Sequence, residues 1–413
     1  RKNPYSVAAL VGALEVSQGE TPAGVQTGGH SPVVPLSGWS IDFFDLEKLD
    51  RFLEDRFVGV TVLAFSFMSI DRPEVRAALD RIGRGARVAV EPTLIAGGAH
   101  PSGDPEGTLA MGFDHAFVGE AEITLPSFLA ALASGREYPA IVRPPRPPPC
   151  MDHFPSFGPA HGLLAPIELS RGCPYSCKFC HVPFVQGRRM HHRSVESVRE
   201  HVRIARARGR VRTWFVTSDA FAYGSRDGQQ GDRDTIQRLL RTCKDEGMDE
   251  VFFGGFPSEV RPDHVQEELL ELVASHCANR TIVIGAQSGS DEVLKRIARG
   301  HDAAAVMDAV RRVRSFGLVP HVDFMLGLPG ETGTERVMTL DMIADITANH
   351  GGRVHVHYFM PHGGTPYADA IPEPVEDSVL AHVETLTGKN LADGYWRKQR
   401  LLAGQVNPRV VGA

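Results

Sequence analysis

The chain has 413 residues, which is long for a single hydrophobic core, so we expect two domains or one large barrel with an appendage. Its composition, 42% hydrophobic and 23% charged, is that of a globular protein with sizeable cores. The net charge of -6 offers no basic surface to a nucleic acid, and no apolar run approaches the roughly 20 residues of a membrane helix. We therefore predict a cytoplasmic protein without a membrane span or a nucleic-acid partner. The first residue is Arg1 rather than Met, which leaves open whether the N-terminus is trimmed.

The first third of the chain alternates apolar strand-like runs with helical patterns, as in a doubly wound, Rossmann-like parallel sheet. Helices are predicted at residues 5–16, 45–56, 73–82 and 125–135, and strands at 32–36, 58–65, 92–98 and 114–120. We expect the strand at 114–120 to lie at an edge of the sheet. Because such a sheet normally begins with a strand and this one begins with a helix, a leading strand is expected to be missing or displaced.

A proline-rich segment from Val142 to Pro159 marks the domain boundary, since it cannot sustain regular structure for long. The predicted organisation is a Rossmann-like domain over 1–140, a linker over 141–162, a barrel over 163–371 and a C-terminal helical segment over 372–413.

Strand and helix patterns alternate six times after the linker. The strands are expected at residues 166–170, 212–219, 250–256, 281–289, 321–330 and 354–361. The helices between them show apolar faces at Val195, Val198 and Val202; Ile236, Leu239 and Leu240; Val265, Leu269, Leu272 and Val273; Leu294 and Ile297; Val306, Val310 and Val313; and Val337, Leu340 and Ile343. Six such units predict a partial or full parallel (β/α) barrel, with reactive groups at the carboxyl ends of its strands.

Three of the six cysteines, Cys173, Cys177 and Cys180, follow the first of these strands within eight residues. Six cysteines in a chain of this size do not make a disulfide scaffold, and clustered ones are typical of metal ligands. A closed zinc site needs four ligands, so His181 or a distant residue would have to complete it. A four-iron four-sulfur cluster suits three thiols better, because three irons are anchored and the fourth stays open.

The segment "CPYSCKFC", with Phe179 before its third cysteine, resembles the signature of the radical S-adenosylmethionine superfamily. In that family the open iron binds S-adenosylmethionine, and an electron from the cluster cleaves it to methionine and a deoxyadenosyl radical. The resemblance implies an external electron donor such as flavodoxin or ferredoxin.

Two later segments, "AQSGSDEVLKRIARGH" and "VDFMLGLPGET", are similar to the fourth-strand and fifth-strand segments of the family. By that similarity Gln287 and Asp323 would contact the ribose. Arg299 would bind the methionine carboxylate, for which a guanidinium is well suited.

The remaining strand ends carry weaker matches. Ser218 and Asp219 stand where the family has a glycine-glycine-glutamate motif for the methionine amino group, and the literal motif is absent. Ser258 and Arg261 end the third strand and are expected at the same barrel mouth. The segment "YFMPHGGTPYAD" resembles the sixth-strand segment near the adenine.

Residues 92–129 resemble the late part of the cobalamin-binding domain that precedes the barrel in one large subgroup of the family. Ser66 stands at one strand end, and Gly97 and Gly98 would allow close approach to a corrinoid. The D-x-H-x-x-G signature, whose histidine ligates cobalt from below, does not occur, so the lower axial position is unassigned.

The resemblance implies a cobalamin-dependent C-methyltransferase acting on an unidentified substrate, with S-adenosylmethionine as both radical source and methyl donor. Radical rearrangement or cyclisation, with or without cobalamin, is the alternative. A methylthiotransferase would carry three further cluster cysteines in its N-terminal domain, and this chain has no cysteine before the linker. A non-catalytic iron-sulfur or corrinoid-sensing protein would not need Gln287, Arg299 and Asp323. No catalytic side chain is assigned.

Overall fold

The computed structural model describes residues 4–19, 35–43, 46–49, 61–84, 91–406 and 410. The chain forms two compact units, Arg1–Pro166 and Ile167–Ala413. Parts of the strand predicted at 32–36 and of the helix predicted at 45–56 lie outside the described residues, as does the start of the strand predicted at 58–65. Among the described helices, none has the length and apolar character needed to cross a membrane.

The N-terminal unit contains a parallel sheet of four strands in the order β1-β2-β3-β4. Their bounds are β1 (Val62–Ser66), β2 (Thr93–Gly97), β3 (His115–Phe117) and β4 (Ile141–Val142). The parallel α/β architecture is therefore as predicted. The prediction that the strand at 114–120 is an edge strand is wrong, because the start of the proline-rich segment forms β4 and pairs Val142 with Phe117.

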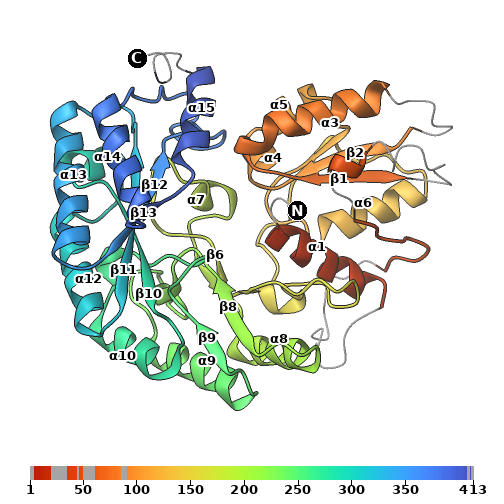
Figure 1. Cartoon of the computed structure of the whole chain (residues 1–413). Coiled ribbons are helices and arrows are strands. Elements are labelled where there is room, and N and C mark those ends of the chain that lie inside the picture. The colour runs from red at the N-terminus through yellow and green to blue at the C-terminus, as the bar shows by residue number, and fades with distance from the viewer. Residues whose placement is uncertain are drawn as a thin grey trace. The chain divides into compact units, whose positions relative to one another are not determined.

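Helices lie on both faces of this sheet, with α3 on one face and α1 and α6 on the other (Figure 1). The helices and helical turns of the unit are α1 (Pro4–Ser17), η1 (Leu46–Lys48), η2 (Ser69–Asp71), α3 (Arg72–Arg84), α4 (Ala99–Gly103), α5 (Pro105–Ala110), α6 (Thr124–Ala133) and η3 (Met151–His153). Helices α1, α3 and α6 confirm three of the predicted helices.

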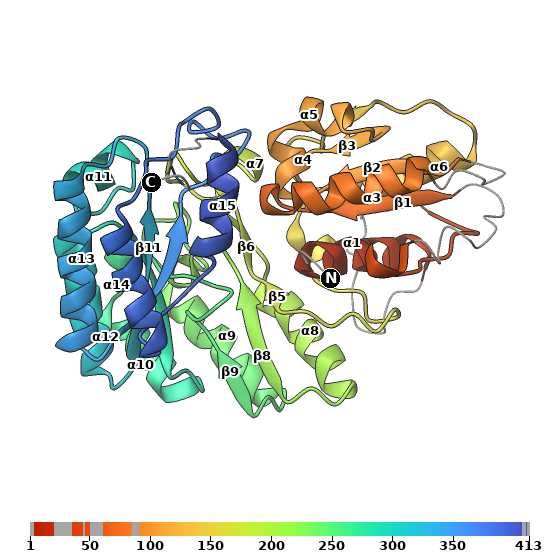
Figure 2. The ribbon, with the colours of Figure 1, turned by 45° about the horizontal axis from the view of Figure 1, so that its top comes forward.

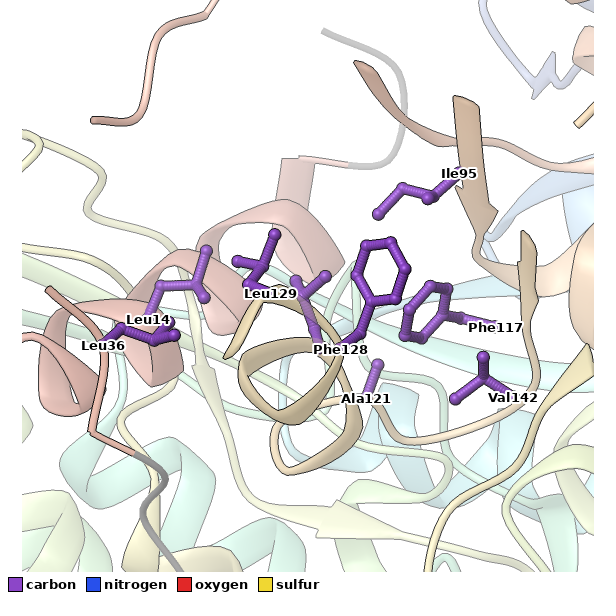
Figure 3. Packing of buried hydrophobic residues seen from close by; sticks show 9 residues of the cluster. Leu14, Leu36, Ile95, Phe117, Ala121, Phe128, Leu129 and Val142 are labelled. Atoms are coloured by element: carbon purple, nitrogen blue, oxygen red, sulfur yellow. The ribbon is translucent and has the colours of Figure 1, made fainter. Parts of the chain in front are cut away.

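The core on one face is built around α6, whose Phe128 is 1% exposed. Figure 3 shows Phe128 and Leu129 between Leu14 of α1 and Phe117 of the sheet. The rings of Phe117 and Phe128 meet edge to face with centroids 5.6 Å apart, an arrangement that aromatic pairs favour. Burial of these apolar side chains explains why the sequence pattern of α6 predicts its position well.

The C-terminal unit is built on seven parallel strands in the order β5-β8-β9-β10-β11-β12-β13. Their bounds are β5 (Ile167–Glu168), β8 (Arg212–Val216), β9 (Glu250–Phe252), β10 (Thr281–Gln287), β11 (Val319–Leu326), β12 (Arg353–Tyr358) and β13 (Ala392–Asp393). A bridge between Val260 and Ile284 joins the β9 side to β10. The two short strands β6 (Ser170–Arg171) and β7 (His191–His192) form an antiparallel pair beside them.

The larger helices lie outside these strands (Figures 1 and 2). The helical elements are α7 (Val182–Val185), α8 (Val195–Ala207), η4 (Ala220–Ala222), α9 (Arg233–Asp245), η5 (Pro262–His264), α10 (Glu267–His276), α11 (Asp291–Arg296), α12 (Ala303–Ser315), α13 (Gly333–Ala348), α14 (Asp377–Gly388) and α15 (Trp396–Val406). The six predicted strands are present, and the segment after residue 372, expected to be helical, also supplies β13.

The predicted apolar face of α13 is partly wrong, because Val337 is 53% exposed. The buried face instead carries Arg336, only 3% exposed, whose Nε lies 3.2 Å from Glu331 and whose Nη1 contacts Glu376. A buried arginine paired with two carboxylates satisfies its donors, and a pattern of apolar residues alone cannot reveal it. The faces predicted for α8, α9 and α12 are buried as expected.

Candidate active site

The cysteine loop leaves β6 at Gly172, a position that only glycine fits. Its φ is +83°, and a Cβ there would lie 2.3 Å from the carbonyl oxygen of Arg189. The loop is fastened on both sides, since the amide of Cys173 donates to the Gly187 carbonyl at 3.1 Å and the Ser218 hydroxyl donates to the Gly172 carbonyl at 2.8 Å. The direction of Cys173 is thereby fixed by backbone geometry.

The three cysteines line one cavity at the carboxyl ends of the strands of the C-terminal unit. The other sequence-predicted site residues that line the same cavity are Phe179, Ser218, Asp219, Arg261, Gln287 and Arg299. Segments more than 100 residues apart in the chain are thus brought together at one place.

The thiols are held in surroundings that favour their neutral form. Burial raises the pKa of Cys173, and it raises the pKa of Cys180 to about 12. Repulsion from Cys177 adds to the effect at Cys173, and repulsion from Cys177 and Cys173 adds to the effect at Cys180. A bound metal centre would supply the positive charge that replaces these protons.

The ligand set fits a cluster better than a closed zinc site, because the described residues that line the cavity include three thiols but no fourth cysteine and no histidine. His181 also does not line the cavity, because its Nε2 is engaged by the Gly363 carbonyl at 2.8 Å.

Arg299 lies beside the thiols in the same cavity. Its Nη1 lies 3.5 Å from the Cys177 sulfur and its Nη2 donates to the Gly285 carbonyl at 2.6 Å. Its Nε is buried without a hydrogen-bond partner. An arginine with an unused buried donor beside three thiols is suited to a carboxylate ligand.

Arg261 is oriented by the chain itself. Its guanidinium carbon lies 3.3 Å from the centre of the Tyr175 ring, and its two terminal nitrogens reach the Arg299 carbonyl at 3.0 Å and Asp263 at 3.1 Å. Stacking of this kind fixes both the ring and the cation. Arg261 therefore braces the loop that carries Cys173 and Cys177.

A buried chain of hydrogen bonds connects the cysteine loop to Asp219. The Tyr175 hydroxyl lies 2.9 Å from His264 Nε2, and His264 Nδ1 lies 2.6 Å from Asp219 Oδ2. The second carboxylate oxygen of Asp219 accepts the Phe221 amide at 3.1 Å. Tyr175 and His264 were missed in the sequence, although an aromatic residue between two cluster cysteines and a histidine near a strand end are signals that point to them.

Glu259 is another residue that the sequence reading missed, although it is a carboxylate at the end of the third strand. It lines the cavity, and a Cβ built on Gly285 would lie 2.6 Å from Arg299, 3.1 Å from Glu259 and 3.3 Å from Gln287. Burial, and then the charge of and a hydrogen bond with Glu259, raise the pKa of Asp323 well above its usual range. Asp323 therefore tends to keep its proton beside Glu259.

Some predicted site residues do not line the cavity. Ser258 is 1% exposed and donates to the Phe215 carbonyl at 2.6 Å, while Asp323 is 4% exposed and hydrogen-bonds with Glu259. In the N-terminal unit, Ser66 and Gly97 end β1 and β2. A Cβ on Gly98, where φ is +98°, would meet the Phe67 carbonyl at 2.9 Å, so packing within the chain already requires this glycine.

The family model "Radical SAM superfamily" matches residues 167–343. A tRNA-2-methylthio-N(6)-dimethylallyladenosine synthase of Halorhodospira halophila is 28% identical over 84% of this chain and 76% of its own length. The fold is similar to that of the radical S-adenosylmethionine methyltransferase TsrM from Kitasatospora setae, solved with cobalamin and a [4Fe-4S] cluster, at a TM-score of 0.58 and 17% identity. That match covers 79% of this chain and 66% of TsrM.

A second similar structure is the cobalamin-dependent S-adenosylmethionine radical enzyme OxsB with aqua-cobalamin bound, at a TM-score of 0.57 and 15% identity. This match covers 94% of this chain but only 55% of OxsB, so the chain spans two thirds or less of either solved protein. The match of the family model agrees with the cavity that the three thiols and Arg299 line. Residues 167–343 of this chain form a radical SAM domain.

Proposed function

We propose that Cys173, Cys177 and Cys180 hold a [4Fe-4S] cluster and that the chain is an enzyme that cleaves S-adenosylmethionine reductively. The observation that carries the proposal is the convergence on a single cavity of three thiols and two arginines, Arg261 and Arg299, each with an unused Nε donor. None of the cavity-lining residues in the described part of the chain is a fourth cysteine or a histidine, which leaves one iron for the substrate.

The cofactor pair supplies the electron and the deoxyadenosyl radical, and the protein binds, orients and shields it. Arg299 binds the methionine carboxylate through Nε, while Asp219, held by His264 and the Phe221 amide, receives the amino group. Gln287 lines the cavity beside Arg299 and Glu259 and contacts the ribose. Phe179, packed against Ile297, covers the thiol side and limits access of water.

In its finer form the proposal is a cobalamin-dependent C-methyltransferase acting on an unidentified substrate. Fold likeness to TsrM and OxsB, both solved with a corrinoid, extends over 79% and 94% of this chain and supports a corrinoid on the N-terminal unit. Ser66 and Gly97 would border it, because parallel sheets take ligands at the carboxyl ends of their strands. A radical rearrangement or cyclisation is the alternative outcome on the same scaffold.

The relative from Halorhodospira halophila points to methylthio transfer as a second candidate. Resemblance to that class implies three further cluster cysteines in the N-terminal domain, and residues 1–149 contain none. Cys243 and Cys277 belong to the C-terminal unit, where burial raises the pKa of each to about 12. The cysteine set therefore favours a single-cluster enzyme.

The first experiment tests cleavage. The full chain is reconstituted anaerobically with iron and sulfide, reduced in the presence of S-adenosylmethionine, and assayed for deoxyadenosine and methionine by mass spectrometry. We expect one cluster per chain and formation of both products. An intact cluster that binds S-adenosylmethionine without producing deoxyadenosine would overturn the enzymatic proposal and favour a sensor.

The second experiment tests the corrinoid. Protein produced in the presence of hydroxocobalamin is desalted, and its visible spectrum and cobalt content are measured. One cobalt per chain supports the finer proposal. A colourless protein with no cobalt would remove cobalamin-dependent methyl transfer while leaving cleavage of S-adenosylmethionine unaffected.

A further inference from the structure

Three side chains of types that ligate metals meet on neighbouring strands. None of the three belongs to the S-adenosylmethionine site proposed above. His321 of β11, His355 of β12 and Asp393 of β13 have ligand atoms within 4.8 Å of one another. His355 and Asp393 are directly paired across β12 and β13, and His321 is paired with Arg353, two residues before His355. Because alternate residues of a strand share a face, the parallel register places all three side chains together.

The geometry at His321 resembles that of a metal ligand. Its Nε2 is buried without a hydrogen-bond partner, yet it lies 3.4 Å from Asp393 Oδ2. Two ligands of one tetrahedral zinc ion, with bonds of about 2.0 to 2.1 Å, are about 3.4 Å apart. The His321 ring also hydrogen-bonds the backbone of Val354, the type of contact that orients ligating histidines.

The second imidazole completes the arrangement from the other side of the carboxylate. His355 Nδ1 contacts Asp393 Oδ1, and the rings of His321 and His355 have centroids 6.0 Å apart. Asp393 therefore lies between two imidazoles, with one oxygen directed at each. His321 and His355 are about one-fifth exposed, so an ion can enter and a water molecule can occupy a fourth position.

The positively charged side chain of Arg353 lies beside these three ligands. Arg353 Nη2 lies 3.3 Å from Asp393 Oδ2 and donates to Asn390 Oδ1 at 3.0 Å. The side chain of Arg353 is 34% exposed, so it can keep its contact with Asn390 while a metal ion takes the carboxylate oxygen. The charge of Arg353 opposes a metal ion and should weaken its binding.

We propose that His321, His355 and Asp393 bind one divalent transition-metal ion, with zinc the best match. Two imidazoles and one carboxylate suit zinc and similar metals, whereas magnesium and calcium prefer oxygen ligands alone. The ion would link three successive strands and fasten β13, which is only two residues long, to the sheet. Three protein ligands leave one position open to water or to a small anionic ligand.

The test uses the full chain carrying Cys173→Ala, Cys177→Ala and Cys180→Ala, so that the thiols cannot bind the probe. This parent is titrated with zinc chloride by calorimetry, and zinc retained after desalting is counted by mass spectrometry. We expect one zinc per chain and a higher melting temperature, reversed by EDTA. If the parent binds no zinc, the proposal fails.

Two added substitutions in this parent identify the ligands. Asp393→Asn and His321→Ala should each weaken zinc binding at least tenfold, whereas His382→Ala, an exposed histidine on α14, should leave it unchanged. Unchanged binding in the first two variants would overturn the assignment, and circular dichroism verifies that they are folded.

Arg353→Ala keeps every proposed ligand and therefore guards against a loss caused by misfolding. Removal of its charge from 3.3 Å should tighten zinc binding several-fold if the ion sits at Asp393. Unchanged or weaker binding would place the zinc elsewhere and refute the site.

Discussion

The strand ends of the two units differ in how far the chain satisfies its own groups. In the C-terminal unit, Arg299 leaves Nε without a partner, three thiols line one cavity, and burial beside Glu259 raises the pKa of Asp323. At the N-terminal strand ends that the structure describes, a Cβ on Gly98 would meet the Phe67 carbonyl at 2.9 Å, whereas a Cβ on Gly97 would meet nothing closer than 3.8 Å. Buried polar groups held at a cost to stability indicate a ligand, whereas glycines are compatible with either packing or binding.

Removal of a thiol should have the largest effect on the activity of the C-terminal unit. Cys180→Ala should abolish the cluster and reduce deoxyadenosine below detection, because a ligand set of two cannot anchor three irons. Iron content and product formation are the measurements. Cys150→Ala, which removes an exposed cysteine, should retain both. Equal iron content in the two variants would show that Cys180 is not a ligand.

Removal of the Arg299 charge should have the next largest effect. Arg299→Met keeps much of the side-chain volume but removes all donors, and a hydrogen bond to a charged group contributes about 1.5 to 3 kcal/mol. We expect the dissociation constant for S-adenosylmethionine to rise about 10-fold to 100-fold while the cluster spectrum is retained, as measured by equilibrium dialysis. Arg311→Met on the exposed side of α12 is the matched control. An unchanged constant would assign Arg299 to structure alone.

The raised pKa of Asp323 predicts how the free energy of unfolding changes with pH. Since burial and Glu259 raise the pKa of Asp323, the folded state binds the proton more tightly than the unfolded state does. The associated stability is present below about pH 4, the ordinary carboxyl pKa, and is lost as pH rises through the raised value. Asp323→Asn keeps a donor for Glu259 and cannot ionise. Relative to the parent, the variant should therefore gain at least about 1 kcal/mol of unfolding free energy between pH 4 and pH 8.

Urea unfolding of the parent and of Asp323→Asn at several pH values measures this difference. Asp308→Asn, at an exposed position of α12, should give a difference that does not change with pH in the same range. If the free energies of unfolding of the parent and of Asp323→Asn change in parallel with pH, the raised pKa of Asp323 is contradicted.

Much of the active site could be predicted because its residues sit next to strong local signals. Cys173 to Cys180 form one short motif, and Gln287 ends a strand whose apolar run is clear, while Arg299 follows the short helix after that strand. Glu259 could not be assigned from its neighbours, since its role depends on Asp323 more than 60 residues away. The same holds for His264, whose partners Tyr175 and Asp219 come from two other segments.

The errors in the fold have a similar origin. Strand β4, Ile141–Val142, is short and borders the proline-rich segment, and it is pairing with β3 that makes it part of the sheet. The buried face of α13 was misplaced because ion pairs with Glu331 and Glu376 offset the burial of Arg336. The cluster of His321, His355 and Asp393 depends on the register of three strands, which no single segment specifies.

The smallest expected effect concerns Gly97 and Gly98 of the N-terminal unit. It shows whether each glycine is required by packing within the chain or by binding of a corrinoid. A Cβ on Gly97 would make only an ordinary contact, 3.8 Å from Phe117, so Gly97→Ala should change the unfolding free energy by no more than about 0.5 kcal/mol. Gly98→Ala should instead destabilise the unit, because φ is +98° and Phe67 lies within 2.9 Å. If a corrinoid approaches the backbone at Gly97, Gly97→Ala should lower cobalt retention without lowering stability. Full retention of cobalt in a stable Gly97→Ala protein would mean that the corrinoid does not approach the end of β2, and the contrast between the two units would become sharper.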